Sequence, residues 1–275
     1  MNPIRVLFPP SLGMPKAHAR AELVESSVAQ ALGRPVSVTV ARDYNELIRS
    51  TLAREADVVW APAGVCGRIS SMAKQVFRVV RQGRTQYRSA VIVRSNSKLT
   101  IDNLGAARGV RAAWVDPHSL GGYILAQELF RRRGINPALV FGEQTFMGSH
   151  PEALAAVTDG RAELAAITAW SGEDHDVRAA LTMHVGPLES RLGVLAVTDE
   201  APTDAIVLTY ELDAEGCAAF EKVLDTTPAT TPAMLQSKKR TMLPSAMGAD
   251  RYEPTSIDTY IQLQRRLSGS IAPPR

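Results

Sequence analysis

The residues best suited to bind an anion lie in segment 115–123, which reads Val-Asp-Pro-His-Ser-Leu-Gly-Gly-Tyr. A predicted buried strand ends at Val115, and a predicted helix begins near Gly121. The first turn of a helix has unpaired N–H groups and a partial positive charge, so an anion can bind there without a lysine. Ser119 adds a hydroxyl donor. The alternative interpretation is structural, with Ser119 as the N-cap of the helix and the glycines forming a turn.

Several other candidate segments lie at the ends of predicted strands or at a crossing between two sets of strands. His150 could simply begin a helix, the indoles of Trp60 and Trp170 could be packing anchors, and Arg88 could form a surface ion pair. Their shared position favours a common site. These segments are Pro10-Ser11-Leu12-Gly13, Trp60-Ala61-Pro62-Ala63-Gly64, Tyr87-Arg88-Ser89, Gly148-Ser149-His150 and Thr168-Ala169-Trp170-Ser171.

The strands and helices that would position these segments alternate along the chain. Residues 4–81 predict strand, helix, strand, helix, strand, short helix, strand, which favours a parallel or mostly parallel sheet with helices on both faces. A β-rich run at 89–94 opens a second set. This set has predicted strands at 112–115, 139–141 and 164–168, with helices at 99–104, 121–133 and 152–158. A third block has strands at 192–197 and 205–208 and helices at 214–224 and 256–267.

Two α/β sets joined by extended segments predict an α/β protein with two lobes and two mixed sheets flanked by helices. We expect one lobe to contain residues 1–88 and 195–275, and the other residues 89–194. The hinge crossings are expected near 87–92 and 190–197. Ligands of open α/β sheets bind beyond the carboxyl ends of the strands, and in two lobes these ends can face a central ligand cleft.

Composition excludes several other classes of protein. The chain has 275 residues, 45% of them hydrophobic and 21% charged, so disorder is not expected. Its 31 basic and 28 acidic residues leave a net charge of only +3, and aromatic residues make up 5%. The basic runs 131–133 and 238–240 therefore predict solvated surfaces and no nucleic-acid partner. With two cysteines, Cys66 and Cys217, we expect free thiols rather than a disulfide framework.

Neither a membrane span nor a secretory signal is visible in the sequence. No segment approaches the length of about 18 apolar residues that a span requires. Met1 is followed directly by a strand-like run that ends at Pro9. As printed, the sequence predicts a cytoplasmic protein; if its N-terminus has been trimmed, the prediction becomes periplasmic.

Four segments together carry a resemblance to a known protein family: Ala56–Trp60, Tyr87–Val93, Val115–Tyr123 and Gly148–His150. In this order and spacing they resemble the phosphate-, phosphite- and phosphonate-binding proteins of ABC importers, which have the type II periplasmic-binding-protein fold. The resemblance extends from Ile4 to about Leu267, and the Asp-Pro-x-Ser-x-x-Gly-Tyr loop is its most specific part.

The resemblance implies non-catalytic binding of a small anionic ligand, phosphonate- or phosphate-like, by a transporter-type solute-binding protein or an intracellular sensor. The implied partners are that ligand and a transporter permease or a signalling protein. In the family, the loop's hydroxyls and the helix N-terminus hold the phosphonate oxygens. By resemblance, the residues holding the anionic group are Ser119, Gly121, Gly122 and Tyr123, those completing the cleft are Tyr87 and His150, and those lining it from the first lobe are Ser11, Tyr44 and Trp60.

Two positions depart from the family's pattern. Members typically have hydroxyl residues where this chain has Leu120 and Gly121. At about 1.5–3 kcal/mol for each hydrogen bond to a charged group, losing two such bonds weakens binding by about two to four decades. The indole of Trp170 stands where members often have a small polar or acidic residue, and it favours a flatter or more apolar ligand.

The alternative is a cytosolic enzyme built on the same fold, with acid/base chemistry by His150, Asp116 or His118. Several motifs are absent, namely the phosphate loop, the His-Glu-x-x-His and Cys-x-x-Cys metal motifs and the Gly-x-Ser-x-Gly nucleophile motif. We therefore expect no cofactor and no metal. Because no nucleophile–base pair converges in the sequence, binding is favoured over catalysis.

Overall fold

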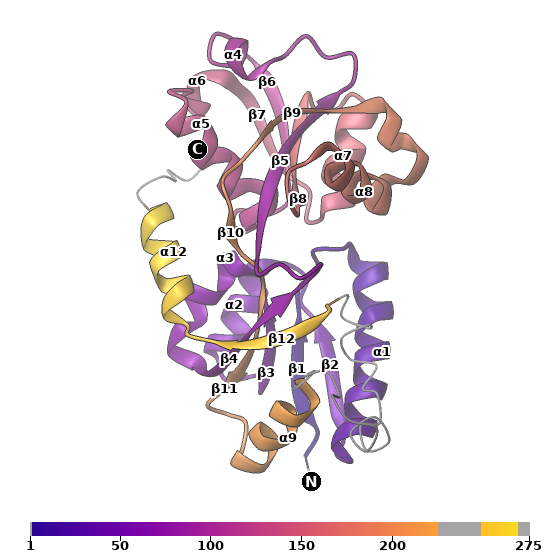
Figure 1. The fold of residues 1–275 in the computed structure, drawn as a ribbon, viewed down its shortest axis with the longest axis vertical. Helices are drawn as coiled ribbons and strands as arrows, with labels where there is room; N and C mark the ends of the chain where they lie inside the picture. The colour runs from indigo at the N-terminus through magenta and orange to yellow at the C-terminus, as the bar shows by residue number, and fades with distance from the viewer. Residues whose placement is uncertain (1, 225–248, 269–275) are drawn as a thin grey trace.

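Two six-stranded mixed sheets, each flanked by helices, form the two lobes seen in Figure 1. The computed structural model describes residues 2–224 and 249–268. The predicted two-lobed α/β architecture is confirmed. The predicted basic surface at 238–240 lies outside the described residues.

The first sheet has the strand order β12-β4-β11-β3-β1-β2. β1 pairs in parallel with β2 and β3, as expected, but β11 lies between β3 and β4 and is antiparallel to both. β4 therefore runs in the same direction as β1, β2 and β3, as expected for a mostly parallel sheet, but β11, a strand from late in the chain, separates it from β3. The strands are β1 (Ile4–Phe8), β2 (Val36–Val40), β3 (Val58–Ala61), β4 (Ala73–Val80), β11 (Ala205–Thr209) and β12 (Arg251–Thr255).

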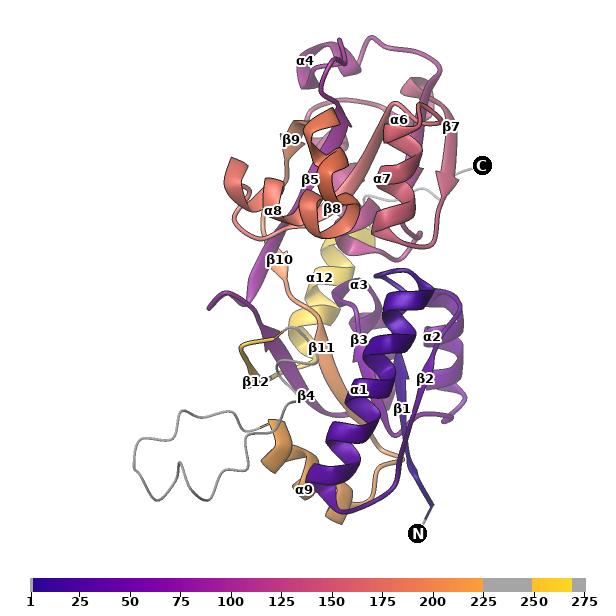
Figure 2. The ribbon, with the colours of Figure 1, turned by 90° about the vertical axis from the view of Figure 1, so that its right-hand side faces the viewer.

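Helices cover both faces of this sheet. The long helix α1 (Met14–Leu32) buries Ala17, Ala21, Val24 and Val28 at helical spacing. It packs beside α9 (Ala214–Leu224) on one face, as Figure 2 shows. The other face is covered by α2 (Tyr44–Leu52), α3 (Ala63–Cys66), η1 (Gly67–Met72) and α12 (Asp258–Ser268).

The second sheet has the order β10-β5-β8-β6-β7, with β9 also paired to β5. Its strands are β5 (Gln86–Arg94), β6 (Val110–Trp114), β7 (Phe141–Phe146), β8 (Leu164–Ala169), β9 (Leu192–Val197) and β10 (Ala201–Pro202). Its helices are α4 (Ile101–Leu104), η2 (Leu120–Ile124), α5 (Leu125–Arg132), α6 (Pro137–Val140), α7 (His150–Thr158), α8 (Asp174–Val185) and η3 (Gly186–Arg191).

Two short stretches of this lobe differ from the sequence prediction. The strand expected at 139–141 begins only at Phe141, because Asn136 caps the short helix α6 and Pro137 occupies its first turn. The helix α8 was not expected at all. Its acidic first turn at Asp174 and Asp176 was the available signal.

The chain crosses between the lobes twice. The first crossing leads from β4 into β5, and the second leads from β10 through Thr203 and Asp204 into β11 (Figure 1). The phenol of Tyr260 in α12 donates to the Thr203 carbonyl at 2.8 Å, so α12 holds the second crossing in place. Because β9 and β10 both pair with β5, strand pairing of the second lobe continues to Pro202. The division expected at 1–88 plus 195–275 and 89–194 stays a prediction, and we propose that the chain returns to the first lobe at Thr203, after β10.

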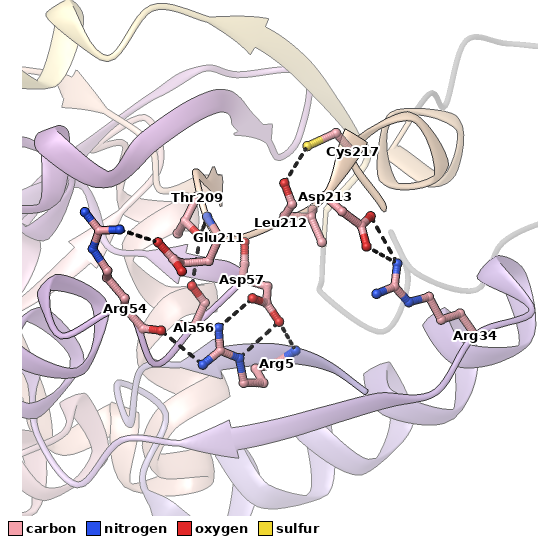
Figure 3. A network of polar contacts seen from close by, with 10 residues as sticks. All are labelled: Arg5, Arg34, Arg54, Ala56, Asp57, Thr209, Glu211, Leu212, Asp213 and Cys217. Atoms are coloured by element: carbon pink, nitrogen blue, oxygen red, sulfur yellow. Dashed lines mark hydrogen bonds and ion pairs between the residues drawn. The ribbon is translucent and has the colours of Figure 1, made fainter. Parts of the chain in front are cut away.

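A polar network joins the ends of strands β1, β3 and β11 that lie away from the other lobe (Figure 3). The carboxylate of Asp57 accepts from the main-chain amide and the guanidinium of Arg5, both at 2.7 Å, and this ties β1 to the start of β3. The hydroxyl of Thr209 donates to the carbonyl of Ala56 at 2.8 Å. The opposite, carboxyl ends of β1 and β3 therefore face the second lobe.

The predicted thiol state is confirmed, since Cys66 and Cys217 are both free and buried. Within residues 2–224 and 249–268, no helix has the length and apolar character that a membrane crossing requires. The same residues contain no cluster of side chains with the composition of a metal site.

Candidate functional site

Ser119 begins the helical segment that follows β6, as the sequence predicts. Its hydroxyl accepts from the Gly122 amide at 3.1 Å, and its carbonyl accepts from the Ile124 amide at 3.0 Å. The latter bond spans five residues, so η2 is a π-helical turn before the regular helix α5. Such wide turns are frequent at functional sites. Ser119 therefore caps the helix and also lies, buried, at the surface where the lobes meet.

The two glycines of this turn allow close packing. A Cβ at Gly122 would overlap the Val115 side chain, and one at Gly121 would overlap the Thr168 hydroxyl and lie 3.2 Å from the Tyr87 ring. The Gly121 carbonyl accepts from the Ser89 hydroxyl at 2.6 Å. The turn is thus held against β5 and β8, and the hydroxyl of Thr168 occupies space that a side chain at 121 would need.

The first lobe contributes Ser11 and Tyr44 to the same place. Tyr44 opens α2, whose N-cap Asp43 accepts from the Glu46 amide at 2.7 Å. Its phenol is buried, and the hydroxyls of Ser11 and Ser119 lie close enough to act on it. Burial raises the pKa of this phenol, so it stays protonated and can donate. The three hydroxyls form one cluster built from both lobes.

Main-chain contacts flank this hydroxyl cluster on two sides. The Tyr44 amide donates to Oδ2 of Asp116 at 3.4 Å, and the His150 amide donates to the Ser11 carbonyl, also at 3.4 Å. Each bond joins one lobe to the other. The structure therefore describes the lobes in contact along their facing loops.

His150 lies at the start of α7, after the N-cap Ser149. Its ring stacks on His184 of α8, with centroids 5.2 Å apart, and lies beside the backbone of Ala166. Burial, with the His184 ring, lowers the pKa of His150 to about 3, and burial, with Lys16, lowers that of His184 to about 4. Both rings are neutral at pH 7. The Nδ1 atom of His150 is buried without a hydrogen-bond partner among the described residues, so it can accept from a ligand.

An aromatic group lies at a second part of the junction. Tyr87 and Trp170 pack edge to face with ring centroids 6.2 Å apart. The guanidinium of Arg81 lies 5.3 Å from the Trp60 ring and 5.6 Å from the Trp170 ring, so it bridges an indole of each lobe. The Trp60 indole N–H donates to Asp204 at 3.2 Å.

Three of the predicted site residues take no part in the contacts described above at the junction of the lobes. Tyr123 packs into an aromatic cluster of its own lobe, 5.4 Å from Trp114 and 5.1 Å from Phe146. Arg88 donates to the Thr198 carbonyl at 2.9 Å and pairs with Glu200 at 3.3 Å, which holds β5 to the segment after β9. Ala61 is fully buried at the end of β3, where its carbonyl accepts from the Cys66 thiol.

The candidate acid/base residues Asp116 and His118 contact each other through the main-chain amide of His118 and not through its imidazole ring. Asp116 accepts from the His118 amide at 2.7 Å, whereas the His118 ring contacts the amide oxygen of Asn45 at 2.9 Å. Burial raises the pKa of Asp116 and, with Arg68, lowers the pKa of His118 to about 4. The carboxylate therefore orders backbone on both sides of the junction and does not activate the ring.

Sequence reasoning missed several residues that the fold brings to the junction. Arg20, Arg81 and Asp204 surround Trp60, although they come from α1 and from the two crossings. His184 of α8 also lies at the junction, where it stacks on His150. None of these has a local motif. For Asp204, its position at the second crossing was the only available signal.

Comparison with known proteins agrees with this architecture. The model of one family, described as "ABC transporter, phosphonate, periplasmic substrate-binding protein", matches residues 7–260. A search of curated protein sequences found no match to this chain.

Several solved structures share the fold. A binding-protein component of a Pseudomonas aeruginosa ABC phosphonate transporter has a TM-score of 0.80 and 17% identity, over 98% of this chain and 86% of that one. PhnD1 of Prochlorococcus marinus, solved with methylphosphonate, has a TM-score of 0.77 and 16% identity, over 98% of both chains. A Xanthomonas citri protein solved with ATP has a TM-score of 0.71 and 14% identity, over 99% of this chain and 100% of that one. At these identities the likeness concerns the fold.

Proposed function

This chain belongs to the family of periplasmic substrate-binding proteins of phosphonate ABC transporters, and on that premise we propose that it binds a phosphonate between its lobes, at Ser119. The observation that carries the proposal is the hydroxyl cluster of Ser11, Tyr44 and Ser119 at the start of η2. A phosphonate group placed there would replace contacts among these hydroxyls with hydrogen bonds to its own oxygens.

The chemistry of the cluster suits an oxyanion. The amides of a helix's first turn have no partner within the helix, and their partial positive charge favours an anion. The hydroxyls of Ser11, Tyr44 and Ser119 can all donate, as can that of Thr168 beside Gly121. These donors offset the absence of hydroxyl groups at positions 120 and 121, where family members typically have them. His150 completes the set, because its unpartnered Nδ1 can accept the proton of a phosphonate monoanion.

Binding is coupled to closure in this proposal. A ligand that contacts both lobes stabilises the arrangement in which they meet, and so shifts the population toward it. The bonds from Tyr44 to Asp116 and from His150 to Ser11 form only in that arrangement. The two crossings, at the start of β5 and at Thr203–Asp204, are where the backbone would bend. The closed form is then the one presented to a transporter permease, and the family description supports the periplasm as the compartment.

The test is isothermal titration calorimetry with methylphosphonate on the wild type and on Ser119→Ala. Loss of one hydrogen bond to a charged group predicts an increase in Kd of about 10- to 100-fold. The matched control is Ser26→Ala, because among the described residues the Ser26 hydroxyl bonds only to the Leu23 carbonyl, on the exposed side of α1. An equal Kd in wild type and Ser119→Ala would refute the assignment of Ser119, and no binding to the wild type would refute the proposed ligand.

A further inference from the structure

A direct contact between two side chains joins the lobes next to the proposed phosphonate site. The Nε2 atom of His118, in the second lobe, lies 2.9 Å from the amide oxygen Oδ1 of Asn45, in α2 of the first lobe. Their neighbours in the chain, Ser119 and Tyr44, belong to the hydroxyl cluster. The two main-chain bonds across the junction are longer, at 3.4 Å each. The contact of His118 with Asn45 is therefore the stronger candidate for a bond that holds the lobes together.

The His118 ring is placed to donate this hydrogen bond. Burial, with the charge of Arg68, lowers the pKa of His118 to about 4, so the ring is neutral at pH 7 and has a single N–H group. The Nδ1 atom is buried without a hydrogen-bond partner among the described residues, and a proton there would be left unpaired. The proton therefore belongs on Nε2, which faces the Asn45 oxygen.

The imidazole is not required for the shape of its own loop. The His118 amide donates to Oδ1 of Asp116 at 2.7 Å, and the Ser119 amide donates to the Asp116 carbonyl at 2.9 Å. On the facing side, Asn45 is exposed and lies in the first turn of α2, whose N-cap is Asp43. The His118 ring and the Asn45 amide can therefore be replaced without removing the bonds that shape either segment.

We propose that His118 is a positioning residue for ligand binding, which holds the lobes together through Asn45 and thereby sets how tightly a ligand between them is bound. The contact forms only when the lobes meet, since its two ends lie on different lobes. Its free energy is added to the closed arrangement without any contact between the His118 ring and the ligand. The effect on affinity rests on the proposed function, whereas the effect on closure does not.

The experiment compares His118→Leu, which removes the donor, with His118→Gln, whose amide nitrogen lies about as far from the main chain as Nε2 and can still donate. Calorimetry with methylphosphonate should give a Kd about 3- to 10-fold higher for His118→Leu and within about twofold of the wild type for His118→Gln. Asn45→Ala, which removes the acceptor, should raise the Kd as much as His118→Leu does. The double variant of His118→Leu and Asn45→Ala should match either single variant within about twofold, because both changes remove the same bond.

Small-angle X-ray scattering without phosphonate provides a measurement that does not depend on the ligand. The radius of gyration should increase in His118→Leu and in Asn45→Ala, but not in His118→Gln. His18→Leu is the control, because it makes the same substitution at an exposed position of α1. It should change neither the affinity nor the scattering.

Three results would each overturn the proposal. The first is a His118→Gln variant that binds as weakly as His118→Leu, and the second is losses that add in the double variant, since either would mean that the ring acts only within its own loop. The third is an unchanged radius of gyration in both variants that lack the bond. If the wild type does not bind methylphosphonate, the proposed function fails, and the scattering of the variants alone decides whether this contact holds the lobes together.

Discussion

The backbone of Gly64 in the first lobe packs so closely against His118 in the second that a Cβ at position 64 would overlap the His118 carbonyl oxygen. Gly64 lies in α3, directly after β3, and His118 lies in the loop that leads to Ser119. The lobes can therefore meet here only because position 64 is a glycine. A substitution of Gly64 changes closure without altering a residue that is proposed to bind the ligand.

Gly64→Ala is expected to favour an open arrangement. The added methyl group must push the lobes apart, because the atom it meets is backbone and cannot rotate away. We expect an increase in the radius of gyration by small-angle X-ray scattering and a rise of about 10-fold or more in the Kd for methylphosphonate. Gly105→Ala is the control, since a Cβ there makes an ordinary contact of 3.6 Å with Ile135. Unchanged scattering and affinity in Gly64→Ala would show that closure does not require this contact.

The two tyrosines assigned to the site from the sequence are expected to differ. Tyr44→Phe removes the phenol hydroxyl from the cluster with Ser11 and Ser119, so its Kd for methylphosphonate should rise about 10-fold. Tyr123→Phe should change it by less than about twofold, because the Tyr123 ring packs against Trp114 and Phe146. Calorimetry on the pair decides this, and a larger loss in Tyr123→Phe would return Tyr123 to the site.

Acid is expected to destabilise the junction through the stacked histidines. In the unfolded chain His184 takes up a proton near its usual pKa of 6.5, whereas in the folded protein burial and Lys16 lower that pKa to about 4. Between these pH values the unfolded state binds more protons, so stability is present above pH 6.5 and is lost as the pH falls toward 4. The groups facing His184 are Lys16 of α1, whose ammonium donates to the Met183 carbonyl at 3.3 Å, and His150 of α7.

The measurement is the free energy of unfolding in urea between pH 7 and pH 4.5. His184→Gln should reduce its decline by an amount on the order of 2 kcal/mol. His18→Gln, which alters an exposed side chain of α1, should leave the decline unchanged. If His184→Gln declines as steeply as the wild type, the histidine pair is not the cause of the acid sensitivity.

Gly121→Ala is expected to destabilise the protein by about 1–3 kcal/mol, because its methyl group would overlap the Thr168 hydroxyl. Gly121→Ala combined with Thr168→Ala should recover part of this loss, since the overlapping oxygen is removed while the Tyr87 ring, at 3.2 Å, remains. Thermal unfolding of the two variants and of Thr168→Ala alone provides the comparison. Strictly additive losses in the double variant would contradict the proposed overlap.

Much of the fold was predictable because it rests on local patterns. Leu192–Val197 is a strand and Ala214–Leu224 is a helix, each with the predicted bounds. The position of β11 between β3 and β4 was not predictable. It depends on pairing between segments far apart in the chain, which no local periodicity encodes.

The residues of the candidate site also divide into those that local sequence predicts and those that it does not. Ser119 could be identified because a strand, a hydroxyl and two glycines within nine residues indicate a helix N-terminus. Arg20 and Arg81 could not, because each is an ordinary charged residue until the fold places both over Trp60. Arg88 is the opposite case. The sequence assigns it to the site because it lies at a predicted crossing, but in the structure its guanidinium bonds to Thr198 and Glu200 of its own lobe.

A crystal structure of the protein with methylphosphonate would show whether Ser119 holds the ligand. We expect phosphonate oxygens within hydrogen-bond distance of the Ser119 hydroxyl and of the first amides of η2, with the Tyr44 phenol donating from the opposite lobe. Methylphosphonate bound elsewhere, for example in the surface pocket lined by Arg94, Lys98 and Asn103, with the cluster of Ser11, Tyr44 and Ser119 unchanged, would contradict it.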